Sequence, residues 1–227
     1  MEKAKISEVF YSIQGEGVYA GIKQVFVRFY GCNLGSCRFC DTRISSYKEY
    51  YAKDLLDEIV HFNDDYHSIS ITGGEPLVQK KFLKEFLLAL KVIGKKVYLE
   101  TNGTMPGALR EIIDYVDIIA MDFKLPSATR LRDFWREHAE FLNIALAKEV
   151  FVKAVVTADT LEDDIKVMRD IIAEINPKVV LVLQPVTYIN GAREPEAGKL
   201  ARFQDACLDK LEAVEIIPQI HRLAGIR

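Results

Sequence analysis

The feature that most constrains the fold of this chain is a regular alternation of two apolar patterns. Short runs rich in β-branched and aromatic residues, which predict buried strands, occur at residues 24–29, 68–72, 97–101, 117–123, 151–156 and 179–183. Helical periodicity occurs at residues 55–60, 82–90, 109–116, 131–142, 165–175 and 200–211. Six such βα units predict an α/β fold, a parallel sheet with outer helices. The pattern alone fits either an open barrel or a doubly wound sheet.

Length and charge limit the possible partners of the chain. Its 227 residues carry 30 Lys and Arg against 33 Asp and Glu, a net charge of -3, and no Pro/Gly/Ser-rich linker divides them. We therefore expect one domain over residues 1–227 and neither a nucleic-acid nor a membrane partner. The amino-terminal residues lack the continuous apolar segment of a secretory signal, which predicts a cytoplasmic location.

Three of the four cysteines lie close together after the first predicted strand. Cys32, Cys37 and Cys40 occupy one loop, whereas Cys207 falls on the apolar face of the last predicted helix, where we expect it to pack in the core. Three thiolates could hold an iron–sulfur cluster with one iron open to another ligand. A zinc site completed by His61 or His67 is a second interpretation, and a disulfide a third.

Polar residues recur where the other predicted strands end, at 72–76 (TGGEP), 100–104 (ETNGT), 122–124 (DFK) and 184–185 (QP). The carboxyl ends of parallel strands meet at one edge of a sheet, so these segments predict a shared pocket. The segment 13–17 (IQGEG) adds an amide and a carboxylate, and Arg28 lies inside the apolar run VFVRF. A guanidinium there needs an anion, either a structural partner or a substrate carboxylate.

These motifs together resemble those of the radical S-adenosylmethionine (SAM) superfamily, through the cysteine loop and the GGEP segment. More narrowly, YSIQGEG, GCNL with CDT, TGGEP, ETNGT and the tail PQIHRLAGIR resemble the 7-carboxy-7-deazaguanine synthase family. That family commonly places three residues between its first two cysteines, and this chain has four.

The resemblance implies an open partial (β/α)6 barrel and a carbon–nitrogen lyase. The implied reaction contracts the ring of 6-carboxy-5,6,7,8-tetrahydropterin to 7-carboxy-7-deazaguanine with loss of ammonia, in queuosine-type deazapurine biosynthesis. The implied cofactors are a [4Fe–4S] cluster, SAM and Mg²⁺, and the implied partners are an electron donor such as flavodoxin or ferredoxin and a second copy in a homodimer. A glycyl-radical-enzyme activase and a non-catalytic metal-binding module remain as alternatives.

The resemblance also implies roles for individual residues. The cluster would bind Cys32, Cys37 and Cys40, and magnesium would bind Thr42. The SAM site would contain Phe39, Gly74, Glu75, Asp122, Phe123, Lys124, Gln184 and Pro185. The substrate site would contain Ile13, Gln14, Gly15, Glu16, Arg28, Thr72, His221 and Arg227. The segments 1–22 and 214–227 would therefore both contribute to the substrate site.

Overall fold

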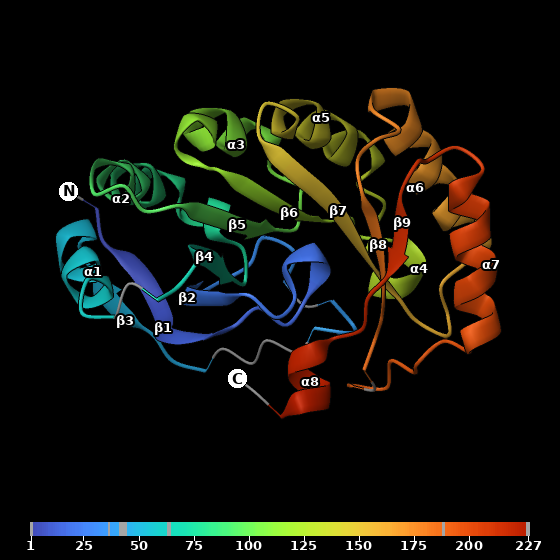
Figure 1. The fold of residues 1–227 in the computed structure, drawn as a ribbon, viewed down its shortest axis with the longest axis horizontal. Helices are drawn as coiled ribbons and strands as arrows, with labels where there is room; N and C mark the ends of the chain where they lie inside the picture. Colours follow the sequence, from blue (N-terminus) through green and yellow to red (C-terminus); the bar gives the residue numbers. More distant parts are fainter. Residues whose placement is uncertain (1, 36, 41–44, 63–64, 188, 226–227) are drawn as a thin grey trace.

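A single curved sheet with helices along its outer face forms the frame of the molecule (Figure 1). The computed structural model describes residues 2–35, 37–40, 45–62, 65–187 and 189–225. Its strands follow the order β3-β1-β2-β4-β5-β6-β7-β8-β9. Since this order runs from one edge to the other, the sheet of the described residues is open, as the partial-barrel prediction requires.

The six predicted strands are confirmed and lie parallel to one another. They are β2 (Lys23–Phe29), β4 (Ser68–Gly73), β5 (Val97–Thr101), β6 (Ile118–Asp122), β7 (Glu149–Val156) and β8 (Leu181–Pro185). The last begins two residues later than predicted, because Asn176 accepts the backbone N–H groups of Lys178 and Val179 in a turn. It also ends two residues later than predicted, so Gln184 and Pro185 lie within the strand.

Three further strands extend the sheet at its edges. The strand β1 (Ala4–Ile13) pairs antiparallel with β2 and with the short β3 (Lys48–Tyr50). At the other edge, β9 (Val214–Ile216) is parallel to β8. Residues from both termini thus flank the six-stranded core.

The predicted helices cover the outer face of the sheet. They are α1 (Ala52–Ile59), α2 (Lys80–Val92), α3 (Pro106–Ile112), α5 (Trp135–Ala145), α6 (Glu162–Ile175) and α7 (Ala197–Leu208). The prediction of one helix over 131–142 is wrong at its start. A short α4 (Pro126–Thr129) ends at Arg130, whose φ of 64° is left-handed, so Leu131 and Phe134 lie in a linker before α5. No described helix has the length and apolar character needed to cross a bilayer.

The two faces of the sheet differ in chemistry. Side chains alternate along each strand, so Ile69 and Ile71 of β4 pack in the core beneath the helices, while Ser70 and Thr72 face the opposite side. That concave side carries the 3-10 turn η1 (Gly17–Tyr19) and the short helix α8 (Ile220–Ala224), as Figure 1 shows. The remaining 3-10 turns, η2 (Pro76–Gln79) and η3 (Ile113–Tyr115), lie next to α2 and α3 in the chain.

Candidate active site

The three clustered cysteines line one cavity of about 980 Å³ on the concave side of the sheet. Cys37 is buried, Cys40 is exposed, and burial raises the pKa values of the Cys32 and Cys37 thiols. Among the described residues, no three His, Cys, Asp or Glu side chains are gathered closely enough to hold a metal ion. The thiols therefore share a cavity without a preformed ligand geometry, which is common where binding completes a metal site.

Neither histidine that could complete a zinc site lies near this loop. His67 immediately precedes β4, whereas Cys32 follows the end of the parallel strand β2, so the two lie at opposite ends of the sheet. The ring centroids of His67 and Tyr19 are 5.3 Å apart. The His61 ring contacts the backbone oxygen of Asp57. The structure thus gives no support to zinc ligation by these residues.

The glycines after β4 allow its turn to lie against the start of the cysteine loop. Gly73 has a φ of 134°, and a Cβ there would overlap backbone atoms of Phe29. At Gly74 a Cβ would overlap the backbone oxygen of Gly31 and lie 3.2 Å from the Cβ of Cys32. Gly74 itself lines the cavity. Absence of a side chain at these two positions is therefore a steric requirement of the site.

The Glu75 carboxylate is fully buried and bonded within the protein. It accepts hydrogen bonds from the backbone N–H groups of Leu77 (3.1 Å) and Asn102 (2.7 Å) and from the hydroxyl of Thr101 (2.9 Å). Burial raises the pKa of Glu75 to about 7. Glu75 does not line the cavity, so its predicted contact with SAM stays a prediction, whereas the neighbouring Gly74 does line it.

A line of alternating charges crosses the cavity wall from β6 to the amino-terminal loop. Lys124 contacts Asp122 at 2.8 Å, Lys153 contacts Asp122 at 3.5 Å, and Lys153 also contacts Glu16. Burial favours a raised pKa for Asp122, but the two ammonium groups outweigh it and hold that pKa below its ordinary value. Lys153 was missed by the sequence analysis, although a lysine inside the run FVKAVV carries the same signal as Arg28.

Two buried acceptors in the cavity have no partner among the described residues. They are Oδ1 of Asp122 and Oε1 of Gln184, and both side chains line the cavity. Phe39 lies beside them in the wall, with its ring 5.2 Å from the Lys124 ammonium. Buried acceptors of this kind fit the donors of a bound ligand, such as the hydroxyl and amino groups of SAM.

Two residues predicted for the SAM site lie elsewhere. Phe123 is buried in the core, with its ring 4.1 Å from the His138 ring, and it does not line the cavity. Pro185 is likewise absent from the wall, because the alternation along β8 turns Gln184 towards the cavity and its neighbour away.

Glu100, which the sequence analysis placed in the polar segment 100–104 without giving it a role of its own, is the centre of a second, partly buried network. Its carboxylate accepts hydrogen bonds from Nε2 of Gln14 (2.7 Å) and from the hydroxyls of Ser70 (3.1 Å) and Thr72 (2.7 Å). Gln14 also donates to Oε1 of Gln24 at 3.0 Å. The predicted substrate residues Gln14 and Thr72 therefore hold Glu100 in place at the cavity wall.

Arg28 forms a structural ion pair and also lies at the cavity wall, and its pairing with a substrate carboxylate stays a prediction. Its Nε donates to the Glu8 carboxylate on the neighbouring strand at 3.0 Å, so a structural ion pair is present. The same side chain is half-buried and lines the cavity, with Phe10 beneath its guanidinium at 5.6 Å. Since the pair uses Nε, it orients the guanidinium along the wall.

The carboxyl-terminal tail lies against the predicted substrate loop. The backbone N–H of Ile220 donates to the Gly15 oxygen at 2.8 Å, and Nε2 of Gln219 donates to Glu16 at 2.7 Å. A Cβ on Gly15 would overlap the imidazole of His221. The predicted residues Ile13, Gly15, Glu16 and His221 all line the cavity. Thr42 and Arg227 lie outside the described residues.

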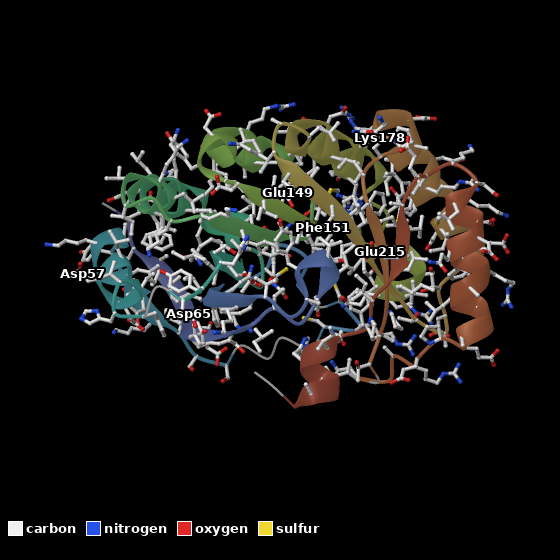
Figure 2. The ribbon with its side chains drawn as sticks, in the orientation of Figure 1. Asp57, Asp65, Glu149, Phe151, Lys178 and Glu215 are labelled. Carbon is white, nitrogen blue, oxygen red and sulfur yellow. The ribbon has the colours of Figure 1, made fainter. Side chains whose placement is uncertain are left out.

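An aromatic wall lies deeper along the strands. Phe151 of β7, labelled in Figure 2, and Tyr98 of β5 have ring centroids 6.4 Å apart, and both line the cavity. Gly17, with a φ of 65°, lies so close that a Cβ would come within 2.5 Å of the Phe151 ring. The cavity thus has charged groups near the strand ends and aromatic groups further in, a combination suited to a flat polar heterocycle.

Comparison with known proteins agrees with this geometry. The sequence profile of the radical SAM superfamily matches residues 26–161. A 7-carboxy-7-deazaguanine synthase of Geobacter sulfurreducens is 38% identical, with 98% of this chain and 97% of that protein covered. This chain belongs to the 7-carboxy-7-deazaguanine synthase family. A synthase of this family from Methanothermobacter thermautotrophicus is 33% identical, over 99% of this chain and 98% of its own.

A solved structure supports the same fold. The crystal structure of QueE from Escherichia coli superimposes with a TM-score of 0.66 at 20% identity, covering 96% of this chain and 95% of the other. The open radical SAM barrel predicted from the resemblance is therefore confirmed. As a radical SAM lyase of the synthase family, the protein uses a [4Fe–4S] cluster and SAM, and the activase and binding-module alternatives are set aside.

Proposed function

We propose that this chain converts 6-carboxy-5,6,7,8-tetrahydropterin to 7-carboxy-7-deazaguanine and ammonia, in the biosynthesis of deazapurines such as queuosine. The observation that carries the proposal is one cavity that joins the cysteine loop to a wall containing Arg28, Glu100 and Glu16. The two ends have the chemistry that a sulfur-bound cluster and a carboxylated heterocycle require. The conversion is an isomerisation followed by loss of ammonia, so it needs no net oxidant.

At the cofactor end, the cluster and SAM supply a 5′-deoxyadenosyl radical when they are bound. Cys32, Cys37 and Cys40 hold the cluster. The backbone at Gly74 approaches SAM closely because no Cβ intervenes. The partnerless oxygens of Asp122 and Gln184 accept hydrogen bonds from SAM, which removes the cost of burying them unpaired.

At the substrate end, charge complementarity orients the pterin. Arg28 pairs with the 6-carboxylate through its terminal nitrogens, while its Nε donates to Glu8. Glu16 and Glu100 accept hydrogen bonds from the N–H groups of the heterocycle. Lys153 pairs with Glu16, and Gln14 with Thr72 keeps Glu100 aimed at the cavity. Fixed groups of this kind supply orientation at little entropic cost during the reaction.

The tail and the remaining predicted partners complete the proposal. The α8 segment, held against Gly15 and Glu16, closes the substrate end and excludes water, with His221 facing the substrate. The residue proposed for Mg²⁺ is Thr42, a hydroxyl ligand suited to a hard cation. We also propose a cytoplasmic homodimer that has no nucleic-acid or membrane partner.

Mass spectrometry of an anaerobic reaction tests the function. The mixture contains cluster-reconstituted protein, dithionite, SAM, Mg²⁺ and 6-carboxytetrahydropterin, with a control that omits SAM. We expect 7-carboxy-7-deazaguanine only when SAM is present. If 5′-deoxyadenosine forms without this product, the radical chemistry stands and the substrate assignment is wrong.

Substitution of Arg28 tests the substrate end separately. Loss of a buried charged partner costs about 2 to 5 kcal/mol, so Arg28→Gln should lower product formation by about 30-fold or more while uncoupled SAM cleavage persists. Arg169→Gln is the matched control, because Arg169 is as well buried and is paired with Asp170 at 2.7 Å outside the cavity. Unchanged turnover in Arg28→Gln would remove Arg28 from the substrate site.

A further inference from the structure

A group of arginines surrounds one carboxylate beside the cysteine loop. Asp159, which follows β7, contacts Arg38, lies 3.3 Å from a terminal nitrogen of Arg130 and 3.9 Å from one of Arg193. We call these four residues the Asp159 patch. The side chains of Arg130 and Arg193 are 62% and 71% exposed, so the positive charge faces solvent.

Arg38 and Asp159 form a partly buried ion pair, but stability does not account for the two outer arginines, Arg130 and Arg193. Exposed ion pairs such as theirs contribute little, typically up to about 1 kcal/mol, and three guanidinium groups around one carboxylate also repel one another. The chain as a whole carries a net charge of -3, so the excess of cations in the patch runs against its overall composition. A local concentration of charge at one surface is typical of a steering surface for a charged partner.

The patch is tied directly to the residues that hold the cluster. Arg38 lies between Cys37 and Cys40 in the chain and donates from its side chain to the Gly191 oxygen at 2.8 Å. The side chain of Asn190 donates to the Cys40 oxygen at 3.0 Å. Cys40 is exposed. The patch therefore lies beside the segment that carries Cys37 and Cys40.

The patch lies outside the cavity that binds small molecules. None of its four described residues lines that cavity, whereas Cys37 and Cys40 do. A partner on this surface would therefore approach the cysteine loop from behind while SAM and substrate stay in place. Leu161, two residues after Asp159 and 59% exposed, is close to the patch in the chain, as are the exposed acidic residues Glu162 and Asp163.

We propose that the Asp159 patch is the docking surface for a small acidic protein that carries a one-electron centre. The inference rests on the proposed function in one respect, because it assumes a cluster bound by the cysteine loop. The donor is oxidised by one electron and the cluster is reduced by one, and no bond forms between the proteins. The occupant is an acidic protein because the arginines attract negative charge, and an exposed cysteine loop lies beside them.

The charge balance predicts a weak and reversible complex. Complementary charge mainly raises the association rate, and redox encounters typically bury less than about 1,200 Å². Glu194 and Glu196, both exposed, lie close to Arg193 in the chain and temper its attraction. Moderate, salt-sensitive binding suits an electron donor, because the donor must dissociate after each electron transfer.

Direct binding measurements test the proposal without reference to turnover. Cluster-reconstituted protein is titrated with oxidised flavodoxin at 20 mM and 200 mM salt, for the parent and for Arg130→Glu combined with Arg193→Glu. The matched control combines Arg110→Glu with Lys178→Glu, which changes the net charge equally. Arg110 lies on α3, and Lys178 precedes β8, at the opposite end of the sheet from the cysteine loop (Figure 2).

We expect the patch variant to bind flavodoxin on the order of tenfold more weakly at low salt and to lose most of the salt dependence. The control should bind nearly as the parent does. Equal weakening in both variants would mean that only net charge matters and would overturn the proposal. Retained flavodoxin binding in the patch variant, with loss of binding to a tRNA probe instead, would assign the patch to nucleic acid and also overturn it.

The source of electrons separates this inference from the proposed function. With dithionite, the patch variant should form product at the parent rate, whereas with reduced flavodoxin it should be about tenfold slower. If the unaltered protein forms no product with dithionite, the proposed function fails, and the binding titration still decides whether the patch docks flavodoxin. Equal loss with both reductants would mean that the substitutions damage the enzyme and would refute a docking role.

Discussion

Replacing Lys153 with methionine removes the buried cation that joins Glu16 to Asp122. Its side chain is 12% exposed and contacts both carboxylates, and methionine keeps its length without the charge. Breaking a buried ion pair by removing one partner costs about 3 to 5 kcal/mol. We expect the lower end, about 3 kcal/mol, because Lys124 still neutralises Asp122 and Gln219 still donates to Glu16.

Thermal unfolding of the apoprotein measures this loss. For a chain of this size, about 1 kcal/mol shifts Tm by about 2 to 4 °C, so Lys153→Met should lower Tm by about 6 to 12 °C at pH 7. The matched control is Lys166→Met, which removes an exposed helical pair with Glu162 at 2.9 Å. That pair is worth about 0.5 kcal/mol or less, a shift of at most about 2 °C.

The loss should also depend on pH in a defined direction. The pKa of Asp122 lies below its ordinary value of 3.8 in the folded protein, so its pairing stabilises the fold above that value and is lost on acidification. In the folded parent, Asp122 takes up a proton only as the pH falls through a pKa below 3.8, and its pairing with Lys153 is then lost. The Tm values of parent and variant should therefore converge as the pH is lowered below 3.8. An equal Tm loss in Lys153→Met and Lys166→Met, or a difference independent of pH, would refute this reasoning.

Three further outcomes are expected. Burial lowers the pKa of His138 from 6.5 to about 4. Between these pH values the unfolded chain binds a proton at this residue and the folded protein does not, so the free energy of unfolding falls as the pH drops. His138→Gln should reduce the stability lost between pH 7 and pH 4.5 by about 2 to 3 kcal/mol in urea unfolding, and an unchanged slope would contradict this. Gly15→Ala should displace His221, because the added Cβ would overlap its imidazole. Proteolysis of the tail should become faster and product formation slower by about tenfold or more, with little change in Tm. A tail that resists protease as well as in the parent would argue against the contact between Gly15 and His221. The Cys207→Ala variant should retain the iron content of the parent and lose about 1 kcal/mol of stability, because Cys207 packs in the core. The Cys40→Ala variant should lose iron, and equal iron contents in the two variants would remove Cys40 from the cluster.

Much of the fold could be predicted because its signals are local. Each core strand is a short apolar run, and each run occurs within a few residues of its predicted position. The exception at 131–142 arose because Leu131 and Phe134 continue the helical period through a linker. A side chain can pack in the core from a loop as well as from a helix, so periodicity does not locate the break.

The candidate site was predictable only in part. Arg28 was identified because a charge interrupts an apolar run, and the same argument applied to Lys153 would have identified it as a buried cation that needs an anion. Glu100 was harder to identify, because its importance comes from Gln14, 86 residues away in the chain, and from two hydroxyls on a neighbouring strand. No local pattern contains such a meeting of distant residues.

The sequence by itself determined the order of the strands and helices along the chain, the cysteine spacing and the polar character of the strand ends, because each of these features depends on residues that are close together in the chain. Tertiary structure alone decided which polar groups bind one another and which remain for a ligand. Glu75 and Gln184 both follow or end a core strand, yet the first accepts three hydrogen bonds from the chain and the second keeps a buried oxygen without a partner among the described residues. The physical reason is the register of the parallel strands, which sets what each side chain can reach.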